Sequence, residues 1–305
     1  MKVLIATVKP FAAAAVEGIR NELVAAGHEV SLLEKYTDNQ QLLDAVKEAD
    51  AMIVRSDKIT PEVLDAAANL KIVVRAGAGY DSIDTAYAKE KGVVVENTPG
   101  QNANAVAELV MGLLVYMLRN RYNGKSGQEL KGKRLGLLAF GNVGRNVARI
   151  AKGFDMDVMA YDAYCPAEAI EQAGVAVAKT QEELFSQCDI VSLHIPATPE
   201  TIKSIGKNYV GLMPKGGILV NAARKEVIHE EELLALMQER TDLQFIADIK
   251  PDTDADFQQL GERYFATPKK MGAQTAEANT NAGIAAAKQI NAFFKDGCTK
   301  FQVNK

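Results

Sequence analysis

The segment from residue 132 to residue 162 constrains the fold of this chain more than any other. A short apolar run at 134–138 breaks into Ala-Phe-Gly-Asn-Val-Gly, and apolar residues with helical spacing follow at 145–154. A second apolar run at 157–161 leads directly into an aspartate. Strand, glycine turn, helix, strand and acid within about thirty residues form the dinucleotide-binding βαβ pattern. We therefore expect a doubly wound α/β sheet that binds a nucleotide at this turn.

The individual residues of the turn have separate expected roles. Gly141 lets the backbone approach a pyrophosphate, and Gly144 lets the helix pack close to its strand, with the positive helix N-terminus facing the phosphates. Asp162 is expected to accept hydrogen bonds from the adenosine ribose and to repel a 2′-phosphate, which favours NAD over NADP. The first glycine of the usual GxGxxG is Ala139 here, and a cofactor-free turn with two glycines is the alternative. The predicted cofactor contacts of the turn are Gly141, Asn142, Val143 and Gly144.

Composition narrows the class of protein further. A chain of 305 residues is long enough for two α/β domains with their own cores. The net charge of −4, with acids and bases interspersed, argues against a nucleic-acid or anionic-membrane surface. Three scattered cysteines fit a reduced cytoplasmic protein without disulfides, and no cluster of ligands at metal-binding spacing occurs, so we expect no metal. The first apolar run is too short for a signal peptide, and no run of about twenty apolar residues predicts a membrane span.

Strand and helix patterns alternate along the rest of the chain. Five short apolar runs separated by helical segments fill residues 1–98, and Pro99-Gly100 follows them. A helix expected at 103–119 is apolar around most of its circumference, which suits a buried helix or a subunit interface. The alternation then continues to a final long helix at 273–294. This pattern predicts two doubly wound parallel-sheet domains that meet at a hinged cleft.

Several further segments resemble the D-2-hydroxyacid dehydrogenase family, and within it the D-3-phosphoglycerate dehydrogenases. These segments occur in the family's order and at plausible spacing, so the resemblance covers nearly the whole chain. They are Val-Arg-Ser at 54–56, Val-Arg-Ala-Gly-Ala-Gly-Tyr-Asp at 74–81, Asn-Thr-Pro at 97–99, Asn-Ala-Val-Ala-Glu-Leu at 104–109, Leu-His-Ile-Pro at 193–196, Val-Asn-Ala-Ala-Arg at 220–224 and Met-Gly-Ala-Gln-Thr at 271–275.

The resemblance implies a division of labour between the two domains. Residues 1–98, completed by 282–305, would form a flavodoxin-like substrate domain, and residues 99–281 would form a Rossmann NAD-binding domain. Members usually pair as homodimers through their nucleotide domains, for which the helix at 103–119 is the apolar element. No C-terminal regulatory domain follows Lys305, so we do not expect feedback by serine through such a domain.

The resemblance also assigns candidate site residues. A 2-hydroxy acid needs a bidentate donor for its carboxylate and a positive charge near the developing oxyanion, and the guanidinium of Arg224, the implied catalytic arginine, supplies both. Asp248 would lie near the nicotinamide carboxamide, although a capping role is the alternative. Further implied cofactor contacts are Ile195, Pro196, Ala222, Ala223, Arg224, Gly272 and Ala273. The implied substrate-binding positions are Arg55, Ser56, Arg75, Gly77, Ala78, Gly79 and Asn104, with Lys58 equally well explained as a solvated charge.

The general acid/base position is where the sequence departs from the family. Most members have a histidine after a Thr-Pro pair, but here Thr267-Pro268 precedes Lys269 and Lys270. A lysine can move the proton if its pKa falls by about 3 units, which corresponds to roughly 4 kcal/mol. We hypothesise that one of the two lysines replaces the histidine. Counting back from Gly272 selects Lys270, which we favour, and counting forward from Pro268 selects Lys269; surface lysines beside an inactive site are the alternative.

The family's glutamate partner is also missing. Its position, five residues beyond Asp248, is Thr253, and the flanking Asp252 and Asp254 are open as replacements. Of the three histidines, only His194 matches a family position on the cofactor side of the sheet, and it is a minor alternative for the acid/base.

The resulting expectation is an NAD-dependent D-3-phosphoglycerate dehydrogenase. It would oxidise the 2-hydroxyl of 3-phosphoglycerate to 3-phosphohydroxypyruvate, the first step toward serine. One alternative is another D-2-hydroxyacid dehydrogenase, such as a glyoxylate or hydroxypyruvate reductase. The other is a non-catalytic protein that senses NAD(H) and binds partners, which the missing histidine and glutamate make conceivable.

Overall fold

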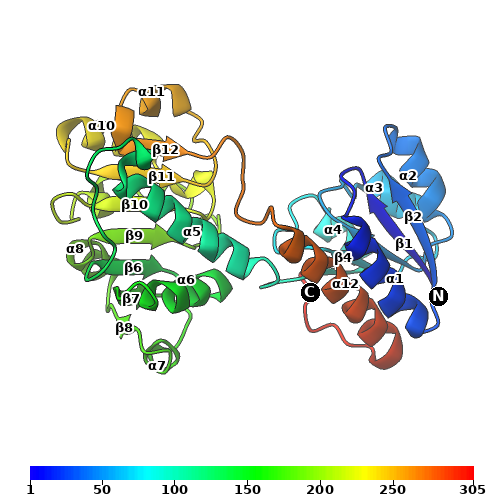
Figure 1. Ribbon diagram of the computed structural model, residues 1–305. Coiled ribbons are helices and arrows are strands. Elements are labelled where there is room, and N and C mark those ends of the chain that lie inside the picture. Colours follow the sequence, from blue (N-terminus) through cyan, green and yellow to red (C-terminus); the bar gives the residue numbers. More distant parts are fainter. The chain divides into compact units, whose positions relative to one another are not determined.

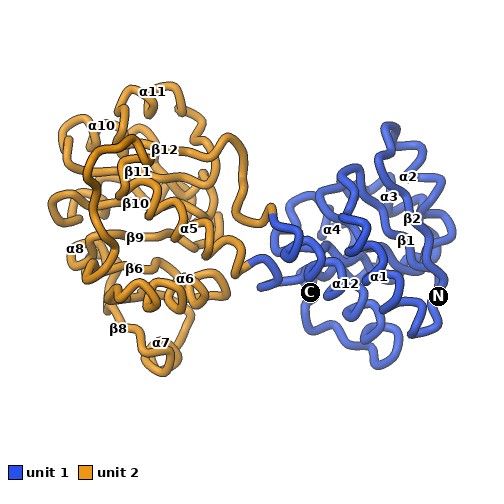
Figure 2. The backbone as a smooth tube through the Cα atoms, in the orientation of Figure 1, with its two compact units in different colours: residues 1–102, 275–305 blue, residues 103–274 orange.

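The computed structural model describes residues 1–305, which form two compact units (Figure 2). Unit 1 comprises residues 1–102 and 275–305, and unit 2 comprises residues 103–274. The sequence placed the boundaries at 98 and 282. The chain returns from unit 2 to unit 1 before the final helix, because the whole of α12 (Ala276–Asp296) packs with unit 1. There it lies beside α1 (Ala13–Ala25) (Figure 1).

Unit 1 is a five-stranded parallel sheet in the order β2-β1-β3-β4-β5. This is the flavodoxin-like order that the sequence predicted. Its strands are β1 (Lys2–Thr7), β2 (Glu29–Glu34), β3 (Ala51–Val54), β4 (Ile72–Arg75) and β5 (Val94–Asn97). Its helices, besides α1 and α12, are α2 (Asn39–Val46), α3 (Pro61–Ala66) and α4 (Thr85–Glu90).

Apolar side chains cover both faces of this sheet. Val3 and Ile5 of β1 point into a cluster with α1 and α12, whereas Leu4 and Ala6 point into a second cluster with α2 and α3. Successive residues of a strand face opposite sides, so a sheet buried on both faces needs a continuous apolar run. That requirement explains why the run at the N-terminus is readable as a buried strand.

Unit 2 is a seven-stranded parallel sheet in the order β12-β11-β10-β9-β6-β7-β8. Read from β8, this is the Rossmann strand order with one further strand at the β12 edge. The strands are β6 (Arg134–Leu138), β7 (Asp157–Tyr161), β8 (Ala176–Val177), β9 (Ile190–Leu193), β10 (Ile218–Asn221), β11 (Gln244–Ala247) and β12 (Tyr264–Ala266). The α-helices are α5 (Ala103–Leu118), α6 (Asn142–Lys152), α7 (Ala167–Glu171), α8 (Gln181–Gln187), α9 (Lys207–Val210), α10 (Glu230–Glu239) and α11 (Asp254–Gln258), with 3-10 turns at Asn120–Tyr122, Lys225–Val227 and Gly261–Arg263.

The long helix α5 lies beside α6 on one face of this sheet (Figure 1). Ten of its sixteen residues are buried, which accounts for its apolar circumference within unit 2 itself. The other face is covered by a cluster that includes residues of α8, α9 and α10. No helix of the chain combines the length and apolar character needed to cross a membrane.

Because all strands of unit 2 run in one direction, their carboxyl ends form a single edge. The loops after β6, β9, β10, β11 and β12 therefore meet there, and in doubly wound folds this edge holds the ligand.

Candidate active site

The glycine turn between β6 and α6 is shaped for close approach by a ligand. A Cβ built on Gly144 would lie 2.4 Å from the carbonyl oxygen of Ala139, so only glycine lets the helix pack this close to the strand end. A Cβ on Gly141 would meet nothing within 4 Å, so no contact within the protein requires a glycine at this position. Gly141 is the N-cap of α6 and provides no side-chain acceptor, so the amides of the first helical residues, Asn142 and Val143, have no side-chain cap. This arrangement fits an anion such as a pyrophosphate.

Asp162, directly after β7, has a structural role that the sequence did not predict. Its carboxylate accepts hydrogen bonds from the backbone N–H groups of Phe140 (2.7 Å), Tyr164 (2.8 Å) and Cys165 (2.9 Å). Burial alone would raise the pKa of Asp162, but these amides and the nearby Arg145 guanidinium lower it overall, so the carboxylate is anionic. Three of about four lone-pair sites are occupied. One site therefore remains for a ribose hydroxyl, and the charge disfavours a 2′-phosphate.

Other predicted cofactor residues follow the neighbouring strands at the same edge. Ile195 and Pro196 follow β9, and Ala222 and Ala223 follow β10, which pairs with β9. Ala222 is buried, Ile195 and Ala223 are half-buried, and Pro196 is exposed. These positions line the edge mainly with backbone and small apolar groups, which suits the flat rings of a dinucleotide.

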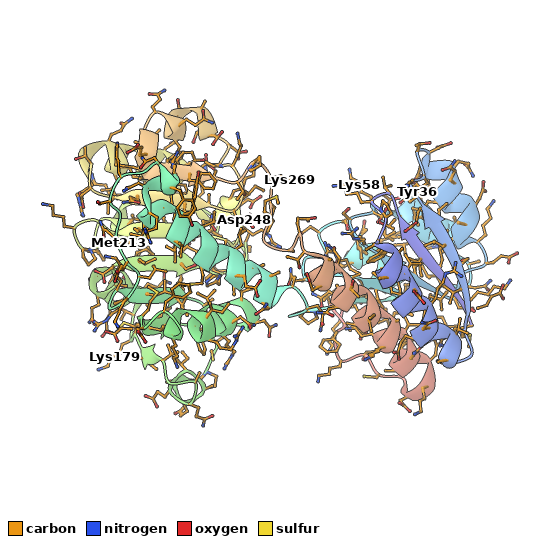
Figure 3. All side chains as sticks on the ribbon, viewed as in Figure 1. Tyr36, Lys58, Lys179, Met213, Asp248 and Lys269 are labelled. Carbon is orange, nitrogen blue, oxygen red and sulfur yellow. The ribbon has the colours of Figure 1, made fainter.

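Asp248, after β11, is 1 % exposed and binds the loop that follows β12. Its Oδ1 accepts from the backbone N–H of Met271 (2.7 Å), and its Oδ2 accepts from that of Gly272 (2.7 Å). The hydroxyl of Thr267 lies 3.0 Å from Oδ1. A Cβ on Gly272 would lie 2.7 Å from Oδ2, so glycine is required there, and Ala273 beside it is half-buried. Figure 3 shows Asp248 and the neighbouring Lys269 where β11 and β12 end.

Arg224 and Lys270, which we call the cation pair, meet at one backbone oxygen. The Nζ of Lys270 lies 2.9 Å from the carbonyl oxygen of Ala223, and Nη1 of Arg224 lies 3.2 Å from it. Both groups donate to this oxygen, so the two nitrogens are at most about 6 Å apart. The structure thus brings together the two residues for which the sequence proposed substrate binding and proton transfer.

Asn221 is a residue that the sequence analysis missed. Its side chain is 2 % exposed; Oδ1 accepts from the N–H of Ala223 (3.0 Å), and Nδ2 donates to the carbonyl oxygen of Arg224 (2.8 Å). Both ends of one amide therefore fix the loop that presents Arg224. The available signal was an amide at the end of an otherwise apolar strand, because a buried amide has to find partners.

Lys269 and the two aspartates considered in place of the family's glutamate lie in different surroundings from Lys270. Lys269 is exposed. Asp252 pairs with Lys225, and Asp254 accepts from Tyr264 Oη (2.7 Å) and pairs with Lys250 (2.9 Å). These carboxylates therefore have partners of their own.

Thr253, at the family's glutamate position, is held by an acid from another element. Its N–H and its hydroxyl both donate to Glu230 at the start of α10, at 2.9 and 2.7 Å. Thr253 thus fixes its loop to α10.

His194 lies directly after β9, with its ring near the glycine turn. Its Nε2 is buried without a hydrogen-bond partner, and its Cδ2 would be 3.9 Å from a Cβ on Gly144. Burial lowers the pKa of His194 to about 4, so the ring is neutral at physiological pH. It is therefore poorly suited to being protonated during a reaction near pH 7.

The predicted substrate residues of unit 1 follow β3 and β4. The Arg55 guanidinium donates to the carbonyls of Lys9 (2.9 Å) and Pro10 (2.8 Å) and to Asn279 (2.5 Å), so it supports the local fold. Ser56 lines an open hollow of about 710 Å³ together with Lys9, Tyr36 and Lys58, the last two labelled in Figure 3.

The loop after β4 is closely packed. A Cβ on Gly77 would lie 1.4 Å from Arg75 Nη1, and the φ of +148° also favours glycine, so the guanidinium lies against bare backbone. Asn97 Nδ2 donates to the carbonyl of Ala78 (2.6 Å), which fixes the loop that continues into Gly79.

Asn104 belongs to unit 2 and has two side-chain partners. It donates to Glu108 (2.7 Å) and accepts from Arg149 (2.7 Å), so it links the first turn of α5 to α6. Across the whole chain, no group of three or more His, Cys, Asp or Glu residues is arranged to hold a metal ion.

These features define a dinucleotide-binding α/β protein that presents two cations at the edge where the nucleotide would bind. The family model of the D-isomer specific 2-hydroxyacid dehydrogenase NAD-binding domain matches residues 110–262. Hydroxypyruvate reductase of Thermotoga maritima is 36% identical over 291 residues, which cover 88% of this chain and 92% of that protein. The chain therefore belongs to the D-isomer specific 2-hydroxyacid dehydrogenase family, as its motifs predicted, and carries that family's NAD-binding domain.

Two further comparisons concern phosphoglycerate dehydrogenases. The solved structure of NAD⁺-bound 3-phosphoglycerate dehydrogenase from Entamoeba histolytica matches with a TM-score of 0.89 at 46% identity, covering 100% of this chain and 99% of that one. D-3-phosphoglycerate dehydrogenase of Methanocaldococcus jannaschii is 36% identical over 282 residues, or 87% of this chain. The chain spans only 53% of that protein's length.

Proposed function

We propose that this protein is an NAD-dependent D-3-phosphoglycerate dehydrogenase. It would oxidise 3-phosphoglycerate to 3-phosphohydroxypyruvate, a step that leads toward serine. The cation pair at the nucleotide edge of unit 2 carries this proposal. Oxidation of a 2-hydroxy acid needs a hydrogen-bond donor to the substrate's carboxylate and, close to it, a group that accepts the hydroxyl proton. The likeness to the Entamoeba protein along its whole length supports the choice of substrate.

In this proposal the two members of the cation pair have different tasks. Arg224 binds the substrate carboxylate and stabilises negative charge on the C2 oxygen. Lys270 acts in its neutral form: one N–H remains on the Ala223 carbonyl, and the nitrogen lone pair accepts the proton of the 2-hydroxyl. When bound, NAD supplies the hydride acceptor. The products are a 2-keto acid, NADH and a proton that leaves from the lysine.

Unit 1 offers groups of its own that could bind a phosphate. Ser56, Lys58 and Lys9 border its hollow, which Asp38 and Asp57 also line, and Arg75 lies against Gly77. We propose that these positive and hydroxyl groups distinguish a phosphorylated acid from an unphosphorylated one. Removal of the phosphate, as in D-glycerate, should then raise KM sharply.

The test is formation of NADH, followed at 340 nm with 3-phosphoglycerate from pH 7 to pH 10. Lys270→Ala should lower kcat by about 10²-fold or more with NADH affinity retained, whereas the exposed neighbour in Lys269→Ala should retain most activity. Loss of turnover only in the Lys269 variant would move the role to Lys269. Full turnover in both variants would refute a lysine base, and no turnover by the wild type with any 2-hydroxy acid would favour an NAD-sensing protein.

A hydroxypyruvate reductase is the second candidate. The Thermotoga relative is matched over 92% of its length, which supports this activity as well. Reduction of hydroxypyruvate with NADH at a higher kcat/KM than that of 3-phosphohydroxypyruvate would favour it.

The proposal includes pairing of two chains through unit 2. A hollow of about 210 Å³ lies at the end of α5, and Phe154 beside it is 40% exposed. Val115, Leu118, Leu130 and Phe154 line it together with Arg119, Gln128, Glu129 and Lys131. Light scattering should give a mass of two chains. A cytoplasmic location is also proposed, supported by three cysteines that are all free thiols.

A further inference from the structure

The segment that carries Lys270 has little regular structure of its own. It runs from the end of β12 at Ala266 to the start of α12 at Ala276, so no strand or helix ladder determines its conformation over these residues. A long, flexible lysine stem would place its amine poorly if it grew from a mobile backbone. Something else must therefore fix this segment.

Asp248 is the group that fixes it. The carboxylate is 1 % exposed and accepts from the N–H groups of Met271 and Gly272, both at 2.7 Å, on one side of Lys270. On the other side, the Thr267 hydroxyl lies 3.0 Å from Asp248 Oδ1 and 2.8 Å from the carbonyl oxygen of Lys269, and its single proton goes to one of them at a time. Hydrogen bonds to a buried carboxylate are among the stronger ones in proteins.

We infer that Asp248 is a positioning residue for the Lys270 amine. Anchored on both sides by one carboxylate, the Lys270 backbone starts from a fixed point, and its Nζ reaches the Ala223 carbonyl 2.9 Å away. With its three donors from this segment, the carboxylate has about one lone-pair site left for a cofactor. This role is additional to any contact between Asp248 and the nicotinamide, and it rests on the proposed function of Lys270.

The arrangement also explains why the two adjacent lysines differ. Lys269 is exposed, whereas Lys270 is half-buried and immediately precedes the anchored Met271. Asp248 thus determines which of the two amines is presented beside Arg224.

The test is a double-mutant cycle of Asp248→Asn and Lys270→Ala in the full chain, with NADH affinity measured for each variant. Asparagine keeps the shape of Asp248, but its NH₂ group cannot accept from a backbone N–H. We expect Asp248→Asn to lower kcat by about 10²-fold, the size that an ångström of misplacement can cost. This loss is measured at saturating NAD⁺, where a weakened contact between Asp248 and the cofactor does not affect kcat. The double variant should be no slower than Lys270→Ala, because the two residues act as one unit.

Other outcomes would overturn the inference in distinguishable ways. If the two losses in kcat multiply, or if Asp248→Asn lowers NADH affinity but leaves kcat at saturating NAD⁺ unchanged, the positioning role is wrong while the lysine mechanism stands. If Lys270→Ala is fully active, the proposed proton transfer fails, and the positioning role fails with it.

A second pair of variants covers the case in which Asp248→Asn does not fold. Thr267→Val removes one anchor with little change in shape, and Thr267→Ser keeps the hydroxyl. The valine variant should lose about 3- to 10-fold in kcat, the equivalent of one hydrogen bond, and the serine variant should stay near the wild-type rate. Equal rates for the two variants would contradict the inference.

Discussion

Ala139, at the first position of the glycine pattern, has a φ of +82°. An L-residue with a side chain is strained in this left-handed region, because Cβ crowds the following carbonyl. Most turns of this kind have glycine at this position. The substitution Ala139→Gly should therefore stabilise unit 2.

The magnitude follows from two opposing terms. The left-handed conformation costs about 1–2 kcal/mol for a residue with Cβ. Glycine also increases the entropy of the unfolded chain, which offsets about 0.4–1 kcal/mol of that gain. The net effect is a stabilisation of about 0.5–1 kcal/mol. For a unit that spans residues 103–274, Tm should rise by about 1–4 °C.

Gly216 offers a matched control in the same unit. Its φ is +81°, and a Cβ built there would meet nothing within 4 Å, so Gly216→Ala tests backbone strain without a steric clash. That variant should lose a similar amount of stability. Calorimetry and urea unfolding of both variants provide the measurement. A lower Tm for Ala139→Gly, or a higher one for Gly216→Ala, would refute the reasoning.

Two further predictions concern the nucleotide turn. Gly144→Ala places a Cβ 2.4 Å from the Ala139 carbonyl oxygen, so it should cost about 1–3 kcal/mol of stability and also weaken NADH binding. Gly141→Ala places a Cβ where no atom lies within 4 Å, so stability should stay within about 0.5 kcal/mol of the wild type. NADH binding by the Gly141 variant should nevertheless weaken about tenfold or more. Equal stabilities, or wild-type NADH affinity in Gly141→Ala, would contradict this. Burial lowers the pKa of His194 from 6.5 to about 4, so below pH 6.5 the unfolded state gains a proton that the native state excludes. The free energy of unfolding should therefore fall by up to about 3 kcal/mol from pH 6.5 to 4. Urea titrations should show a smaller fall for His194→Gln, and an identical pH dependence in the two proteins would contradict the prediction.

The parts of the fold that long patterns encode were readable from the sequence. The strands at 134–138 and 157–161 have the predicted bounds, because each is a buried run flanked by polar residues or turns. By contrast, β12 (Tyr264–Ala266) and α9 (Lys207–Val210) are too short for a period to emerge and were not predicted. Their conformations depend on neighbours that the chain brings together only after folding.

In the candidate site, the sequence likewise predicted some features and not others. The residue types at the strand ends were identifiable, because the family's motifs name them. The partners of Asp162 and Asp248 were not, since both carboxylates bind backbone N–H groups, which every residue except proline has. For the same reason, no sequence pattern marks the carbonyl of Ala223 as the oxygen where Arg224 and Lys270 meet.

The two departures from the family pattern belong together on chemical grounds. A histidine base becomes charged as it accepts the proton, so a glutamate beside it stabilises the product of that step. A lysine begins charged and must first lose a proton, and a new carboxylate beside it would oppose that loss. The chain has Thr253 at the glutamate position, held by Glu230, and it places a guanidinium near the Lys270 amine. Under the proposed role of Lys270, replacing histidine by lysine therefore calls for removing the acid as well, and each change favours the other.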